Sequence, residues 1–493
     1  MNKDARAPSA RRTTMPHQSF VNHEAAGSAA VVGFAALSLA TLGTVPLIPW
    51  LVNMQGSHAL LATTHVFVCA LGAAYAIRGR LRPCLLVASV FPYCWLVLPS
   101  IFQISHVEAA WGDPGVTLDY SATIRAQGVL LLGQVSLLVG YLAAATRRRP
   151  PGERWEVDSA GRSRLLTMSV VLLLGAIALV PLVIGAAGGV GALFTSRQGF
   201  NQALASGGLS DGSSSAAALV KIVPSSLATS AAVLALWLVR NRAPQDERPY
   251  RAKVVAAVAA ALLLVVANPF AFTRYLVLAC FGAVAMSYFT PRKQLAAVAA
   301  LGASLVAFLL AYPAANFFRT GTTSSTSGYL LATPDFDGFQ QTINTVNYVD
   351  VEGISWASHI VSGLFFFVPR ELWSAKAVPS AFPVAQERGY NFLNLSMPLP
   401  SEAYLDLGWI GVVLILGLLG GAWATLDRGW LDQTRLAVLA AYVAVAQVGL
   451  WRGPFGSLVP IFGFTIGLLL VATVLSGEGL GQRSRRRRAS LTP

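Results

Sequence analysis

Apolar runs recur along the whole chain and are separated by mostly short polar segments. A helix that crosses a bilayer needs about 20 predominantly apolar residues, and these runs reach that length again and again. The pattern therefore predicts an all-α polytopic membrane protein with about twelve transmembrane helices. The expected spans are 27–52, 58–77, 83–102, 124–145, 165–187, 216–239, 252–267, 272–289, 294–313, 404–426, 436–451 and 457–476.

One polar interruption, 314–403, is much longer than the others and separates the ninth expected span from the tenth. It begins with the flexible polar linker TGTTSSTSG. It also contains an apolar stretch, 354–369, that is too short to cross a bilayer comfortably and is expected to lie at the membrane interface. The predicted organisation is a tail (1–26), spans one to nine (27–313), the long loop (314–403), spans ten to twelve (404–476) and a basic tail (477–493).

The basic residues orient these spans. Short loops rich in Lys and Arg stay in the cytoplasm, and seven polar segments, the two tails among them, carry 27 of the 36 Lys and Arg residues. We therefore expect an inner-membrane protein with both termini in the cytoplasm and the long loop outside. The net charge of +14 mostly reflects this topology, so no nucleic-acid partner is expected. We interpret the RSRRRR tail first as a solvated run of charges, with contact to anionic membrane lipids as the alternative.

The remaining basic residues lie in or near outward-facing segments, against the usual bias. Singly, such residues often extend to lipid headgroups and do nothing more. As a group, several beside aromatic residues, they suit an anionic lipid-linked substrate, because the Arg guanidinium binds phosphate oxygens with two parallel donors. The candidates for binding a diphosphate are Arg274, Arg370, Arg197, Arg452, Lys376 and Arg319.

Candidates for a general base lie in and just after the long loop. Glu402 and Asp406 in PLPSEAYLDLGWIG are four residues apart, which puts them on one face if the helix starts that early. A partly desolvated carboxylate can act as a base, whereas an acid at a helix start can also serve only the helix dipole. We rank Glu402 first and His359 second, although a lone histidine is usually accommodated by packing.

Metal and cofactor signals are weak. Asp335 and Asp337 form a D-x-D pattern that binds metal diphosphates in some contexts, but here it sits between Pro334 and Gly338, which favours a turn. We assign no metal and no cofactor. The four cysteines all fall in apolar runs and are expected to be small core residues.

Several segments resemble the bacterial O-antigen and capsule repeat-unit polymerases of the Wzy type. VPRELWSAKAVPS is similar to that family's P-R-x-x-W-x-x-K stretch, and SEAYLDLGWIGVV to its G-E-x-Y-x-x-F-G-W-x-G stretch. NPFAFTRY and LFTSRQGF also resemble segments that carry arginines in that family. Ser401 and Leu407 depart from the pattern, in place of a glycine and an aromatic residue.

The resemblance implies a membrane glycosyltransferase of the GT-C kind that polymerises oligosaccharide repeat units linked to undecaprenyl diphosphate. A growing glycan would be the donor and a lipid-linked repeat unit the acceptor, with a flippase or chain-length regulator as further partners. Arginines would stabilise the departing diphosphate, led by Arg274, Arg370 and Arg197, and Glu402 or His359 would accept the proton. Aromatic residues would stack on sugars, although interfacial belts use the same residues: Trp373, Tyr390, Tyr404 and Trp409.

Two alternatives stay open. A ligase would transfer the finished glycan to another acceptor by similar chemistry. A transporter or flippase would be no enzyme and should show repeat symmetry and interrupted helices near the membrane midplane. The chain concentrates its unusual residues in segments expected at the outer face, which disfavours a transporter.

Overall fold

The computed structural model describes residues 37–112, 118–147, 155, 157–195, 197–206, 215–241, 249–269, 272–289, 299, 330–393 and 395–476. Within these ranges the protein is all helical and contains no strand. The all-α prediction is confirmed. The tails, the ninth expected span apart from residue 299, and the start of the long loop lie outside the described residues.

Long helices follow the predicted apolar runs closely. They are α3 (Gly56–Ile77), α4 (Pro83–Pro92) continued through η2 (Tyr93–Val97) into α5 (Leu98–His106), α7 (Tyr120–Thr146), α8 (Ser159–Ala186), α10 (Ser215–Arg240), α11 (Pro249–Val266), α12 (Arg274–Tyr288), α17 (Leu399–Asp432), α18 (Leu436–Ala446) and α19 (Phe455–Leu475).

Shorter elements connect them. They are η1 (Val45–Leu47), α2 (Ile48–Val52), η3 (Val190–Phe194), α9 (Arg197–Ser206), η4 (Leu330–Ala332), η5 (Pro334–Phe336), α14 (Gly338–Glu352), α15 (Ser358–Leu364), α16 (Ala381–Glu387) and η6 (Gln447–Trp451).

Within the described residues, seven helices are long and apolar enough to cross a membrane: α3, the α4–α5 run, α7, α8, Val220–Arg240 of α10, α17 and α19. Three further apolar helices, Leu37–Val52, Arg274–Tyr288 and Leu436–Trp451, are shorter. The membrane character of the chain is thus supported by helix length and composition. The count of twelve spans stays a prediction.

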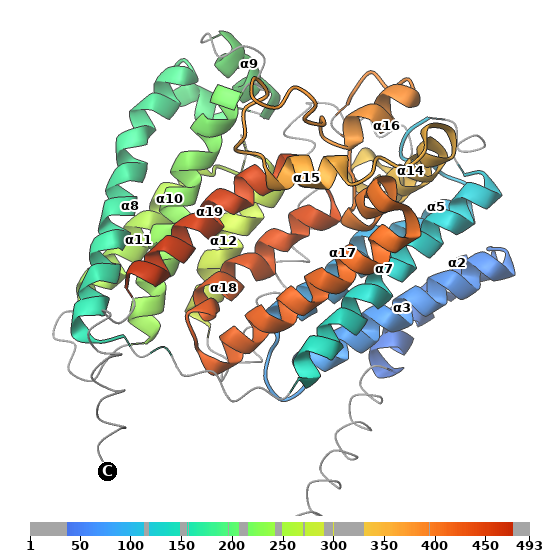
Figure 1. The fold of residues 1–493 in the computed structure, drawn as a ribbon, viewed down its shortest axis with the longest axis horizontal. Helices are drawn as coiled ribbons and strands as arrows, with labels where there is room; N and C mark the ends of the chain where they lie inside the picture. The colour runs from blue at the N-terminus through green and yellow to red at the C-terminus, as the bar shows by residue number, and fades with distance from the viewer. Residues whose placement is uncertain are drawn as a thin grey trace, which may run out of the picture.

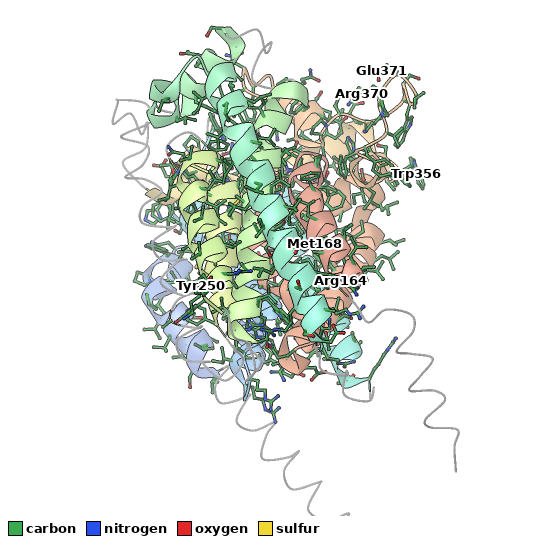
Figure 2. All side chains as sticks on the ribbon, turned by 90° about the vertical axis from the view of Figure 1, so that its left-hand side faces the viewer. Arg164, Met168, Tyr250, Trp356, Arg370 and Glu371 are labelled. Atoms are coloured by element: carbon green, nitrogen blue, oxygen red, sulfur yellow. The ribbon has the colours of Figure 1, made fainter. Side chains whose placement is uncertain are left out.

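The long helices lie side by side, and three short helices gather at one end of them (Figure 1). These are α14, α15 and α16, which belong to the segment predicted as a long loop. We call this end of the bundle the loop end. Arg370 and Glu371 lie at the loop end, whereas Arg164 and Tyr250 lie toward the opposite end (Figure 2). The described part of the predicted loop is therefore largely helical.

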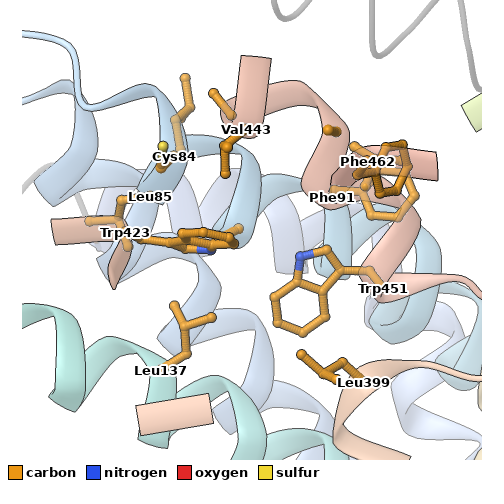
Figure 3. Close-up of a cluster of buried hydrophobic side chains, with 14 of the residues drawn as sticks. Cys84, Leu85, Phe91, Leu137, Leu399, Trp423, Val443, Trp451 and Phe462 are labelled. Carbon is orange, nitrogen blue, oxygen red and sulfur yellow. The ribbon is translucent and has the colours of Figure 1, made fainter. Parts of the chain in front are cut away.

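The core between the helices is built from large apolar side chains. Trp95, Trp430 and Trp451 are almost fully buried, and Trp451 lies in one cluster with Phe91 and Phe462 (Figure 3). Three of the four cysteines are buried, Cys94 is half-buried, and all four are free, as expected for core residues.

Helices α7 and α17 pack so closely that their backbones touch. A Cβ added at Gly140 would lie 2.0 Å from the carbonyl oxygen of Gly417, and one at Gly420 would lie 2.0 Å from the carbonyl oxygen of Leu137. Small residues permit this approach between apolar helices, where packing rather than water drives association. The contact fixes α17, which carries the acidic site candidates.

Gly420→Ala should therefore destabilise the protein by roughly 1–3 kcal/mol, the usual cost of overpacking. Gly421→Ala is the matched control, because its added Cβ would meet nothing closer than the Ala144 Cβ at 3.9 Å. Thermal unfolding of both variants in detergent measures the difference. Equal midpoints for the two variants would contradict the close backbone contact.

Candidate functional site

Helix α17 begins at Leu399, before the predicted start at residue 404, and is sharply kinked about two turns later, at Leu407 and Gly408. Leu407 (φ −141°, ψ 16°) and Gly408 (φ 61°, ψ −152°) leave the helical conformation. The conformation of Gly408 is essentially restricted to glycine. The kink thus separates a short first segment, which carries Glu402 and Asp406, from the rest of the helix.

The kink also provides backbone acceptors for the segment that leads into α15. Ser355 N donates to the carbonyl oxygen of Leu405 (2.9 Å), and Ala357 N to that of Asp406 (3.1 Å). In this segment, Trp356 (φ 51°) and Ala357 (φ 63°) adopt left-handed conformations that are costly for residues other than glycine. These backbone hydrogen bonds hold the start of α15 in place.

Asp406 joins this arrangement through its side chain. Its Oδ2 accepts from Ile360 N (2.8 Å), and its Oδ1 lies 2.8 Å from His359 Nδ1. The Asp406 side chain is fully buried, and that of His359 is 9% exposed. An ionised carboxylate only accepts, so beside ionised Asp406 the donor is Nδ1, and in the neutral imidazole Nε2 is then the acceptor. No hydrogen bond to a described residue engages Nε2, so His359 has the form of a general base oriented by a carboxylate.

Glu402, the first-ranked base from the sequence, has different surroundings. It is fully buried, and both carboxylate oxygens accept hydrogen bonds: Oε1 from Ser380 Oγ and Oε2 from Phe455 N, each at 2.7 Å. These bonds tie the first turn of α17 to the starts of α16 and α19. The geometry favours a positioning role for Glu402 and makes His359 the better candidate for the base.

Two of the predicted phosphate-binding arginines lie close to one carboxylate. Arg274 Nη1 is 3.8 Å from Asp335 Oδ2, and Arg452 Nη2 is 3.7 Å from Asp335 Oδ1. The Arg452 guanidinium also stacks over the Trp95 ring at 4.7 Å. Both arginine side chains are mostly buried, at 13% and 17% exposure. Among the described residues, two cations thus face one carboxylate. We call Arg274 and Arg452 the arginine pair, and Asp335 is its counter-ion.

The backbone around Arg452 is joined to the first segment of α17, which carries Asp406. Met397 N, just before α17, donates to the carbonyl oxygen of Arg452 (2.8 Å), and Phe455 N, three residues later, donates to Glu402. Helix α15 packs on the same turn, because a Cβ added at Gly363 would lie 2.7 Å from the Phe455 ring. Glu402 therefore ties the segment that carries Asp406 to the turn that follows Arg452.

Arg370 and Lys376 donate to backbone carbonyls. Arg370 Nη1 and Nη2 donate to the carbonyl oxygens of Lys376 and Ala377, at 2.6 and 3.2 Å. Lys376 Nζ donates to those of Phe365, Phe366 and Val368, just past the end of α15. These contacts brace the loop that follows α15, as cations commonly do at helix ends. Arg370 stays exposed at the edge of the molecule (Figure 2).

The remaining candidates are spread out. Arg197 is the first residue of α9, but its side chain is not described, and Arg319 lies outside the described residues. Tyr404 is buried and packs edge to face against Trp409 at 5.2 Å, which places these two rings together at the start of α17. Trp373 is half-buried in the braced loop.

The D-x-D pair divides between two environments. Asp335 faces the arginines, whereas Asp337 Oδ2 accepts from Trp111 Nε1 at 3.1 Å. Burial raises the pKa of Asp337 to about 6, despite hydrogen bonds from Ser396 and Trp111 that lower it. Within the described ranges, no group of three or more His, Cys, Asp or Glu residues could hold a metal ion.

Sequence reasoning missed Trp111 and the polar face of α14. The signal was available in the run GFQQTINTVNY, which has four amide side chains in a chain that is 55% hydrophobic. Comparisons of the chain with protein-family models, with curated proteins and with solved structures find no match.

Asp337→Asn should change how stability depends on pH. The folded-state pKa of about 6 lies above the ordinary value of 3.8, so ionisation of Asp337 destabilises the folded protein as pH rises from about 4 to about 6. Asparagine cannot ionise. The free energy of unfolding of Asp337→Asn relative to wild type should therefore rise by up to about 3 kcal/mol between pH 4 and pH 7.

Thermal unfolding in detergent at pH 4.5 and 7.5 measures this effect. Asp350→Asn, at the exposed ion pair with Arg125, is the control and should change stability by less than about 1 kcal/mol. If the difference between Asp337→Asn and wild type is the same at both pH values, Asp337 does not ionise in a buried site.

Proposed function

We propose that the protein is a membrane glycosyltransferase that polymerises undecaprenyl-diphosphate-linked oligosaccharide repeat units at the outer face of the inner membrane. One structural link supports the proposal: Glu402, on the same short helical segment as Asp406, accepts from Phe455 N, three residues after Arg452. This segment connects the His359–Asp406 pair with the arginine pair, Arg274 and Arg452. A base and a diphosphate-binding group joined in this way suit transfer of a sugar from a lipid diphosphate to a hydroxyl.

The arginines would act on the leaving group. Breaking the anomeric C–O bond leaves its electron pair on the diphosphate, and fixed cations stabilise the charge that develops. In the free protein Asp335 is their partner, at distances longer than the usual 2.7–2.9 Å of a charge-assisted hydrogen bond. A diphosphate, with more charge and more acceptor oxygens, would displace Asp335 from this position.

His359 would act on the acceptor. As the acceptor oxygen forms the new C–O bond to the anomeric carbon, its proton passes to Nε2. The resulting imidazolium is stabilised by Asp406, which already holds Nδ1 at 2.8 Å. Glu402 would position both groups, since its oxygens are bound to Ser380 and Phe455.

The proposed placement rests on charge. Segments that carry 27 of the 36 Lys and Arg residues would lie in the cytoplasm, which leaves the loop end, with Arg370, on the outside. A ligase would use the same chemistry; the resemblance of the VPRELWSAKAVPS and SEAYLDLGWIGVV segments favours a polymerase. A flippase that supplies the substrate and a regulator of chain length would be natural partners.

Purified protein incubated with a lipid-linked repeat unit should produce a ladder of longer products. His359→Gln should lower the rate of chain growth by about 10²–10⁴-fold, the usual contribution of a general base. His106→Gln, at the end of α5, is the matched histidine control and should keep the wild-type rate. A wild-type rate for His359→Gln would exclude His359 as the base.

The same assay tests the arginines by comparing Arg452→Ala with Arg370→Ala. Arg452→Ala should abolish the ladder, whereas Arg370→Ala should retain most of it because Arg370 contacts loop carbonyls. The opposite result would indicate that the diphosphate binds at the loop after α15, beside Arg370. If the wild-type protein makes no ladder and instead transfers the whole glycan to another acceptor, the protein is a ligase.

A further inference from the structure

Helix α14 is polar and yet buried. Gln340, Gln341 and Asn344 are at most 1% exposed, and Asp337, which immediately precedes the helix, is 2% exposed. Buried amides and carboxylates are costly unless their hydrogen bonds are satisfied. A helix that buries this many polar side chains in an apolar chain calls for a functional explanation.

The polar side chains form a closed ring of hydrogen bonds with two aromatic residues from other segments. Trp111 Nε1 donates to Asp337 Oδ2 (3.1 Å), and Gln341 Nε2 donates to the same oxygen (3.5 Å). Asn344 Nδ2 donates to Gln341 Oε1 (3.0 Å) and to the Tyr390 hydroxyl (3.2 Å). The ring closes through Gln340, whose Nε2 donates to the Tyr390 hydroxyl (3.2 Å) and to the carbonyl oxygen of Trp111 (2.6 Å).

Three hydrogen-bonding positions of this ring are left over. Asp337 Oδ1 and Asn344 Oδ1 are buried and have no partner among the described residues. The Tyr390 oxygen accepts from two amides, so its own O–H proton remains to be donated. A ligand that completes the ring must therefore offer two donors and one acceptor.

We propose that this ring and the side chains of Trp111 and Tyr390 form a saccharide-binding subsite. Sugar hydroxyls both donate and accept, which matches the leftover positions. The two aromatic rings are half-buried, with centroids 6.3 Å apart and planes at 40°, and offer apolar surface for the C–H face of a pyranose. An anion would be repelled by the carboxylate of Asp337. Tyr390 follows an exposed turn at Gly389, which places this side of the ring near the surface.

The subsite adjoins the arginine pair, and its role in catalysis rests on the proposed function. Asp335 and Asp337 are two residues apart, one facing each site. Ser396 N approaches Asp337 Oδ2 at 3.5 Å, and the next residue, Met397, donates from N to the carbonyl oxygen of Arg452 at 2.8 Å. A sugar in the ring would thus lie beside a diphosphate held by the arginines.

Two probes test the subsite in purified full-length protein in detergent. Saturation-transfer NMR measures binding of glucose, galactose, mannose and N-acetylglucosamine, and calorimetry measures binding of inorganic pyrophosphate. At least one sugar should bind wild-type protein. Tyr390→Phe should lower the affinity for that sugar about fivefold, because the hydrogen bonds of the Tyr390 hydroxyl are lost. Pyrophosphate binding should stay unchanged in Tyr390→Phe.

Tyr442→Phe, at a buried tyrosine of α18, is the matched control and should leave sugar binding unchanged. Trp111→Phe keeps an aromatic ring but removes the donor to Asp337, so it should lower the affinity for the same sugar. This variant replaces Tyr390→Phe in the test if Tyr390→Phe does not fold. Absence of sugar binding to wild type, or equal weakening by Tyr390→Phe and Tyr442→Phe, would overturn the subsite.

The saccharide subsite and the diphosphate site are tested independently by these two probes. Tyr390-dependent sugar binding without pyrophosphate binding would support the subsite and contradict the diphosphate site. Pyrophosphate binding that Arg452→Ala removes, without binding of any of the four sugars, would support the diphosphate site and contradict the subsite.

Discussion

Three buried carboxylates of α17 each accept hydrogen bonds from the first backbone amides of a different helix. Glu402 binds Phe455 N of α19, Asp406 binds Ile360 N of α15, and Asp427 binds Cys84 N and Leu85 N of α4. The first amides of a helix have no partner within it and carry the positive end of its dipole. In a dry interior these amides need acceptors, so α17 fixes where three other helices begin.

The candidate site follows from two of these contacts. Because the kink at Gly408 ends the first segment of α17, the carbonyl of Asp406 faces the backbone before α15 while its carboxylate reaches His359. Glu402 fixes the start of α19 three residues after Arg452. An oriented imidazole and a pair of arginines thus depend on one short, kinked helical segment.

Much of the fold could be predicted from sequence, because hydropathy is a local property: the long described helices follow the expected apolar runs, whereas α9, α14 and α16 lie outside them. The shared buried face of Glu402 and Asp406 also followed from their spacing of four residues. Pairings across the chain could not be predicted. Asp335 was assigned to a turn because nothing near it in sequence shows that Arg274 and Arg452 face it. The backbone contacts of Arg370 and Lys376 could not be predicted either, because their carbonyl partners are set by the path of the loop after α15.

Hydrogen exchange tests whether the kink in α17 holds the start of α15. In Gly408→Ala, strain at the kink should speed exchange of the amides of Ser355, Ala357 and Ile360 by about tenfold or more. Exchange in the rest of α17 should stay as in wild type. Gly467→Ala, where an added Cβ meets nothing within 4 Å, is the control. Wild-type exchange at these three amides in Gly408→Ala would contradict the account.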